Sequence, residues 1–291
     1  MLKLQSKVEY LYNLFFSDRN QKRFQKATLW LSMIGFVFHL LLIYAKKFEL
    51  FKAPFETGLL DNPISAIYTP FTIILIYEIY LLVVNLPRSF TTSVSKQFEI
   101  ISLILIRRIF ADIPKIDLNA EWFKTSSNVQ LIYDVLGVLI LYFLIYLFNK
   151  ERLKLDKKPL SSKIKNFVIS KKAVSVVLLS ILIVLSFTSA INWAFDLFYN
   201  NTSGDINSIF YNEFFSVLIL ADVFILLLSF QYTERYSQIV RNTGFIICTI
   251  LIRLSFGVSG LTNVILVISS VLFGLLILSI YNLSEKQNKD S

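Results

Sequence analysis

Two apolar stretches of the chain each carry an arginine at a matching position. Residues 98–110 read FEIISLILIRRIF and residues 245–256 read FIICTILIRLSF, so that Arg107 aligns with Arg253. A charged side chain at the centre of a bilayer costs about 2.5–3.5 kcal/mol on insertion scales, and such residues usually pair or face water. The repeated arginine therefore predicts buried charge that is balanced in both halves of the chain.

An acidic residue stands in the apolar stretch that precedes each of these arginines. At the rise of an α-helix, Glu78 and Arg107 lie about 12 and 15 Å from the same end of their segments. By the same estimate, Asp222 and Arg253 lie about 14 and 15 Å from that end. We therefore expect each arginine to pair with the carboxylate of the helix before it.

Three further ionisable residues lie within apolar segments. Arg108 points about 100° away from Arg107 on a helix, so it needs another partner, and Asp134 is the candidate. Asp134 lies nearer the outer end of its segment, where lipid headgroups are an alternative partner. His39 is either a candidate proton acceptor or a hydrogen-bonded packing residue. Together these charges either border a path for an ion or proton or only lock the packing of the helices.

The composition is that of a polytopic membrane protein. Hydrophobic residues make up 55% of the chain, charged residues 17%, and the mean hydropathy is +0.62. A soluble domain of this length would expose more charge. The net charge of +9 comes from basic residues gathered before residue 28 and in residues 149–172, which is typical of cytoplasmic loops on anionic lipid. We therefore expect membrane lipid as a partner and no nucleic acid.

The hydropathy pattern predicts an all-α fold of eight transmembrane helices. The expected spanning segments are residues 28–45, 65–86, 97–113, 128–148, 173–195, 209–231, 244–258 and 261–283. Since the arginine stretches and flanking residues recur, these segments form two parallel four-helix repeats (4+4). The expected units are an amphipathic segment at 1–27, a first repeat at 28–148, a basic hinge at 149–172, a second repeat at 173–283 and a tail at 284–291.

Lys and Arg in alternate loops predict the orientation of the chain. They fall on one side together with both termini, and the positive-inside rule makes that side cytoplasmic. The abundance of Lys, Ile, Phe and Asn suggests an AT-rich bacterium, and hence its inner membrane. The amphipathic residues 1–27 are expected either to lie on the inner membrane surface or to pack on the protein itself.

Several kinds of chemistry are excluded by residue types. Cys248 is the only cysteine and His39 the only histidine, which leaves no disulfide framework, zinc site or Cys/His nucleophile pair within one chain. Because a nucleotide-binding loop and a Ser/His/Asp set are also missing, we expect no cofactor and no enzymatic activity. The favoured function is an ion channel or pore, formed either by a homo-oligomer or by the two repeats of one chain, with the paired charges bordering the ion pathway. The alternatives are an ion- or proton-coupled secondary transporter and a non-conducting scaffold or accessory subunit.

Overall fold

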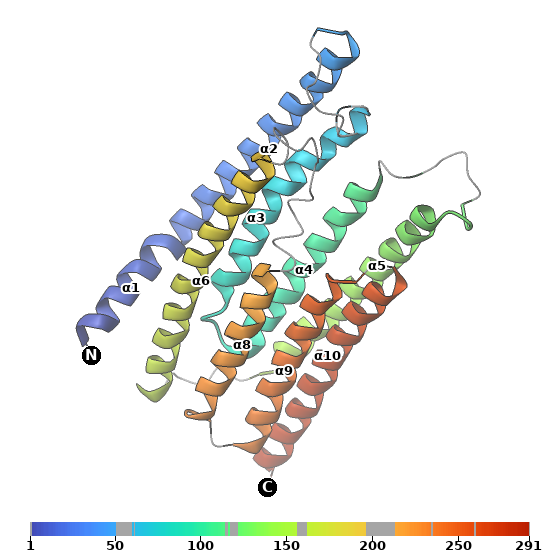
Figure 1. Ribbon diagram of the computed structural model, residues 1–291. Coiled ribbons are helices and arrows are strands. Elements are labelled where there is room, and N and C mark those ends of the chain that lie inside the picture. Colours follow the sequence, from blue (N-terminus) through green and yellow to red (C-terminus); the bar gives the residue numbers. More distant parts are fainter. Residues whose placement is uncertain are drawn as a thin grey trace.

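The computed structural model describes residues 2–50, 60, 62–113, 116, 122–155, 162–195, 213–233, 235–258 and 260–290. Within these residues the fold is all-helical, as the composition predicts, and contains no strand. The elements are α1 (Leu2–Phe16), α2 (Asp18–Lys47), the short 3₁₀ helix η1 (Pro63–Ile67), α3 (Tyr68–Asn85), α4 (Phe90–Asp112), α5 (Ser126–Arg152), α6 (Ser162–Phe195), α8 (Phe215–Phe230), α9 (Tyr236–Ser255) and α10 (Leu261–Asp290). From α2 onward the long helices run alternately up and down, and both ends of the chain lie at the same end of the bundle (Figure 1).

Five helical stretches in the described part of the chain are long and apolar enough to cross a membrane. They are Gln5–Lys47, Pro63–Asn85, Ser126–Arg152, Ile164–Ser189 and Leu261–Gln287. Helix α8 is apolar but shorter, with 16 residues. Helices α4 and α9 carry the aligned arginines and are not among the five. These helices make the chain compatible with a membrane-embedded protein, while the eight-helix 4+4 arrangement remains a prediction.

Several helices extend beyond the apolar segments that hydropathy detects. Helix α2 begins at Asp18, before the first expected segment, and α9 begins at Tyr236 rather than at residue 244. Helix α6 begins at Ser162, inside the expected hinge of residues 149–172. Helix α10 continues to Asp290 through most of the expected tail. Polar and basic residues have adequate helix propensity, so the hydrogen-bonded spiral continues where the apolar pattern stops.

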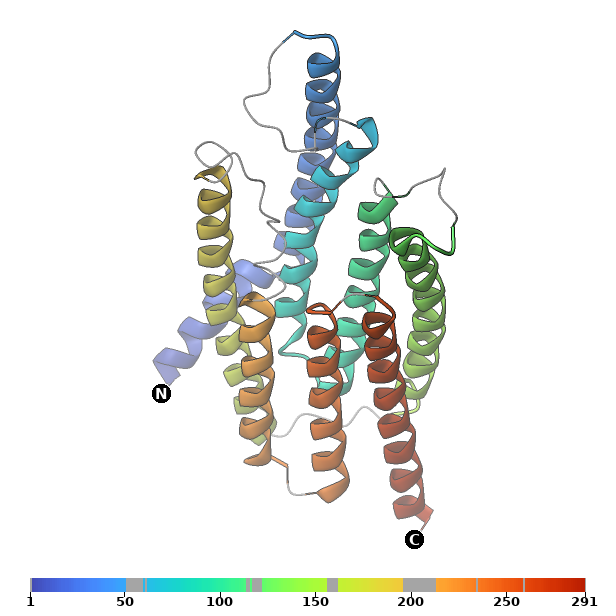
Figure 2. The same ribbon diagram turned by 45° about the vertical axis from the view of Figure 1, so that its right-hand side comes forward.

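Helix α1 packs on the protein, which is one of the two arrangements that its sequence predicts. The chain breaks from helical geometry at Ser17, where ψ is 148°, and α1 then leaves the direction of α2 (Figure 2). The Phe16 ring stacks on Tyr80 of α3 at 5.7 Å, and the Tyr80 hydroxyl donates to the Phe15 carbonyl at 2.9 Å. Tyr10 of the same helix is 69% exposed.

The packing centre of the bundle lies among α4, α5, α9 and α10. Each of these helices contacts two others of the set: α4 packs on α5 and α9, and α10 packs on α5 and α9. Their aromatic core joins Phe98, Phe148 and Phe245, with ring centroids 5.0 and 5.8 Å apart. At Gly137 of α5 the backbone approaches α10 so closely that an added Cβ would lie 2.5 Å from a methyl carbon of Val264.

The two parts of the chain repeat the same order of helix neighbours. In the first part α2 packs on α3, α3 on α4 and α4 on α5; in the second part α6 packs on α8, α8 on α9 and α9 on α10. The contacts α4 to α9, α5 to α10 and α3 to α6 join the two parts. We call this boundary the seam. The helices that carry the aligned arginines therefore meet each other at the seam.

Large apolar side chains cover much of the outer surface. On α5 the exposed fraction reaches 63% for Leu139 and 72% for Tyr142, and on α2 it is 62% for Leu41. A soluble protein would seldom leave so many large apolar residues in water. The exterior of the bundle is thus suited to contact with lipid.

Candidate functional site

The most enclosed charge cluster in the described residues is centred on Arg253 of α9. Its Nη1 lies 2.7 Å from Oδ2 of Asp222 on α8, and both side chains are 2% exposed. Its Nη2 donates to Oε1 of Gln97 on α4 at 2.9 Å. The Thr249 hydroxyl also donates to Asp222 Oδ2, at 2.8 Å. The Arg253 cluster therefore contains the predicted ion pair and extends across the seam.

A second cluster surrounds Arg107 of α4. The Nε atom lies 3.2 Å from Oε2 of Glu78 on α3, and these side chains are 7% and 6% exposed. Nη1 donates to the backbone carbonyl of Phe71 at 2.9 Å. The Phe71 ring stacks on Phe110 at 5.3 Å, close to the same helix–helix contact. The Arg107 cluster holds the other predicted pair, and its ion pair joins α3 to α4.

The third cluster joins Arg108 to Asp134 and to the opposite side of the seam. Arg108 Nη2 lies 2.8 Å from Asp134 Oδ1 of α5 and 2.7 Å from Asn263 Oδ1 of α10. Gln130 Nε2 donates to the same Asp134 oxygen at 2.8 Å. Asp134 is only 4% exposed, so it belongs to this cluster and not to the lipid headgroups. The Asn263 amide also donates to the Ser255 carbonyl, which brings the end of α9 into the cluster.

His39 lies at a different helix contact. Its Nδ1 lies 2.7 Å from the Thr69 hydroxyl, which joins α2 to α3. Nearby, an added Cβ at Gly35 would come within 2.9 Å of the Thr69 methyl carbon, so the two helices approach closely. This geometry matches the packing interpretation of His39, while its role as a proton acceptor remains a prediction.

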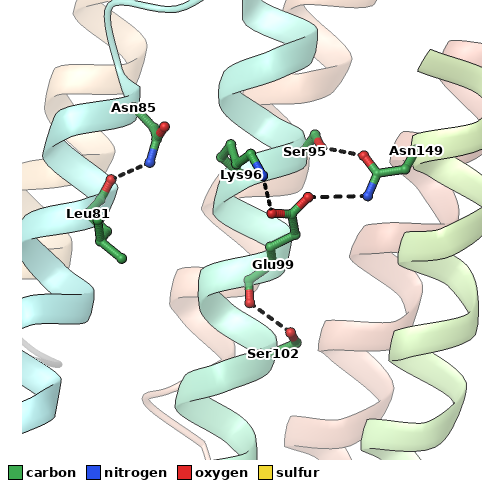
Figure 3. A network of polar contacts seen from close by, with 7 residues as sticks. All are labelled: Leu81, Asn85, Ser95, Lys96, Glu99, Ser102 and Asn149. Atoms are coloured by element: carbon green, nitrogen blue, oxygen red, sulfur yellow. Dashed lines mark hydrogen bonds and ion pairs between the residues drawn. The ribbon is translucent and has the colours of Figure 1, made fainter. Parts of the chain in front are cut away.

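A fourth polar network holds α4 to α5 and is less enclosed. The Ser95 hydroxyl donates to Oδ1 of Asn149 at 2.6 Å, and Asn149 Nδ2 donates to Oε1 of Glu99 at 3.3 Å. Lys96 forms an ion pair with the same carboxylate (Figure 3). The side chains of Lys96 and Glu99 are 36% and 34% exposed, so solvent screens this pair more than the three buried clusters.

Three buried polar residues of the site did not stand out in the sequence. Gln97 and Asn263 each accept a hydrogen bond from the guanidinium of an arginine that lies across the seam. The third is Lys171 of α6, which is 2% exposed although it belongs to the predicted basic hinge of residues 149–172. A weak signal existed for Asn263, because Asn128 occupies the matching position in the first half and is also fully buried.

The clusters are surrounded by closely packed protein. Two small, partly open cavities lie beside the clusters, and each has room for about one water-sized sphere, about 10 Å³. One is lined by Asp134 and Asn263 together with apolar residues of α4, α5 and α10. The other is lined by Gln97, Lys171 and Asp222. In the described part of the chain, no group of three or more His, Cys, Asp or Glu side chains is placed to hold a metal ion.

Comparison with known proteins gives no relative from which a role could be transferred. No protein-family model, curated protein or solved structure matches this chain.

Proposed function

We propose that this protein moves ions across a membrane along the seam between its two halves, and that it is a gated channel in a closed conformation. The proposal includes eight crossing helices in two four-helix repeats, with both termini on the cytoplasmic side of a bacterial inner membrane. The observation that carries it is that arginines of each half form hydrogen bonds with carboxamide side chains of the other half. Arg253 of the second half donates to Gln97 of the first, and Arg108 of the first donates to Asn263 of the second.

These hydrogen bonds suit a gate because the arginines and carboxamides can bond to each other only when the two halves lie together. A cavity of about 10 Å³ is too small for a continuous file of water and ions. Separation of α4 from α9 would break the hydrogen bond from Arg253 to Gln97 and expose both groups to entering water. The same polar groups that hold the closed state would then line the open path, since buried ionisable groups in membrane proteins commonly mark ion pathways.

A secondary transporter is the second candidate, and the small cavity lined by Gln97, Lys171 and Asp222 favours it. This cavity has walls from both halves of the chain, and transporters built from repeats bind their substrate at the interface of the repeats. A channel and a transporter differ in flux: only the transporter should show saturation by a substrate and a fixed proton or ion stoichiometry.

Ion flux into liposomes tests the proposal. Reconstituted protein should pass ions. Asp222→Asn and Glu78→Gln should each change the rate of ion flux by at least about tenfold, because a change of about 1.4 kcal/mol in the energy of the ion pair corresponds to that factor. The matched control is Glu285→Gln, which neutralises a carboxylate in the partly exposed pair with Arg235, 2.6 Å apart. This control should leave the rate unchanged.

Three results would count against parts of this proposal. Liposomes that remain silent at a verified protein density would refute it. Well-folded Asp222→Asn and Glu78→Gln proteins with unchanged flux would show that the clusters only lock helix packing. A protein that is silent alone but co-purifies with a partner through α1 or the basic hinge would be a scaffold or accessory subunit.

A further inference from the structure

Lys171 is a buried cation near the cytoplasm-facing end proposed for α6. Its Nζ donates to the Arg88 carbonyl at 2.7 Å and lies 4.5 Å from the centre of the Phe90 ring and 5.2 Å from that of Phe167. Within the residues that the structure describes, no carboxylate oxygen lies within 4.0 Å of Lys171 Nζ, the distance that defines an ion pair. The neighbouring Lys172, in contrast, lies 3.5 Å from Glu9. Lys171 therefore contacts a carbonyl and two aromatic rings, but it has no counter-ion among the described residues.

Among the described residues, the other buried charged side chains are already matched. Arg253 balances Asp222, and the other two buried carboxylates each have an arginine as described above. When these pairs are set aside, Lys171 leaves one unbalanced positive charge among the buried side chains of the described residues. An enclosed charge without a counter-ion is costly, because the interior solvates it poorly. This excess favours a negatively charged ligand nearby.

A small cavity lies directly beside Lys171. Its polar lining consists of Lys171, Ser93, Gln97 and Asp222, and the rest of its wall is apolar. It is partly open and has room for about one water-sized sphere, about 10 Å³. A single small anion is the ligand that suits this space.

The orientation of Gln97 makes the cavity rich in hydrogen-bond donors. Because Gln97 Oε1 accepts from Arg253, the amide Nε2 points the other way and donates, with Ser93 Oγ at 3.4 Å. Ser93 accepts in that contact, which leaves its hydroxyl hydrogen to donate elsewhere. Lys171 belongs to the same lining, and its ammonium group has three donors and no acceptor, of which one donor is used by the Arg88 carbonyl. The Asp222 carboxylate also reaches the cavity, but Arg253 at 2.7 Å balances its charge.

We propose that this cavity binds one monovalent halide ion, chloride under ordinary conditions, with Lys171 as its counter-charge and Gln97 and Ser93 as its hydrogen-bond donors. Lysine and arginine side chains give anion selectivity in membrane pores for the same electrostatic reason. The binding site stands on its own geometry. Its place on the ion path rests on the proposed function, and it then makes the transported ion an anion.

Thermal unfolding of the purified protein tests the binding site. Unfolding in sodium chloride should occur at a higher temperature than in sodium gluconate of equal ionic strength, and the gain should saturate, because a ligand that binds only the folded state stabilises it. Lys171→Met should abolish the difference. The matched control Lys172→Met removes the adjacent lysine, which pairs with Glu9 outside the cavity, and should retain the difference.

Two variants keep the site test decisive even when one is poorly folded. Lys171→Arg retains the positive charge and should keep a chloride effect with at least a fivefold altered midpoint. If Lys171→Met fails to fold, this variant and the wild-type titration decide. A wild-type protein that unfolds at the same temperature in chloride and gluconate overturns the proposal, and so does a folded Lys171→Met protein that keeps the chloride effect.

The reversal potential of reconstituted protein in a potassium chloride gradient tests the selectivity. Movement of the reversal potential toward the chloride equilibrium potential is the expected result. A cation-selective current would keep the proposed function and refute the anion path. The absence of any current, together with chloride-dependent stability that Lys171→Met removes, would refute the proposed function and keep the halide site.

Discussion

Removal of the Arg253 guanidinium should destabilise the protein far more than removal of a charge from an exposed ion pair of nearly equal length. Arg253 lies 2.7 Å from Asp222 with both side chains 2% exposed, whereas Arg235 lies 2.6 Å from Glu285 with side chains 44% and 18% exposed. The separation of charges is thus nearly the same, and burial is the main difference. The two pairs form a matched test of how burial changes the energy of an ion pair.

The magnitudes follow from the surroundings of each pair. Arg253→Met leaves the Asp222 carboxylate and the Gln97 carboxamide without their cation in the buried interior, and removing one partner of a buried pair costs about 3–5 kcal/mol. Glu285→Gln loses only a solvent-screened contact, for which about 0–1 kcal/mol is expected. The double substitution Arg253→Met with Asp222→Leu should recover part of the loss, because no uncompensated charge then remains buried.

Reversible unfolding in mixed detergent micelles, followed by the fluorescence of the three tryptophans of the chain, measures these differences. Far-ultraviolet circular dichroism of the folded baseline checks that each variant retains its helices. The reasoning is refuted if Arg253→Met lowers the free energy of unfolding by no more than Glu285→Gln does. It is also refuted if the double substitution is less stable than Arg253→Met alone.

The close contacts of the seam give three further predictions. Gly137→Ala should destabilise the protein by about 1–3 kcal/mol, since its new Cβ would lie 2.5 Å from a Val264 methyl carbon; adding Val264→Ala should restore much of the loss in the same unfolding assay. Gln97→Leu should cost about 1–3 kcal/mol because it leaves a buried N–H of Arg253 unsatisfied, and a loss that disappears in an Arg253→Met background would verify this cause. Asn263→Leu should cost at least as much as Gln97→Leu, since that side chain both accepts from a guanidinium and donates to a carbonyl; equal stability to the wild type would contradict the observed geometry.

The sequence was most informative where a feature occurs twice. The order and depth of Glu78 and Arg107 predicted their pairing, and the same reasoning applied to Asp222 and Arg253; both pairs are present. Helical rise and the approximate end of each segment were enough for this estimate. The membrane class followed in the same way from the apolar composition and agrees with the apolar helices of the structure.

The hydrogen-bond partners across the seam could not be predicted from the sequence, because they depend on how helices that are distant in the chain pack together. Gln97 precedes Arg253 by more than half of the chain, and no local rule indicates that α4 lies against α9. Lys171 was concealed for another reason: it lies in a basic stretch that composition assigns to a solvated loop. Its helix begins earlier, at Ser162, and turns this lysine toward Phe90 and Phe167.

The bonds that cross the seam also constrain how the chain can be made. A helix bundle that inserts from its N-terminus would place Gln97 and Arg108 in the membrane long before Arg253 and Asn263 leave the ribosome. Until then Arg108 has Asp134 from its own half, but its carboxamide acceptor is not yet synthesised. Completion of the polar core therefore falls to the last two helices, and a nascent chain that stops before α10 would expose unfinished charge to quality-control proteases.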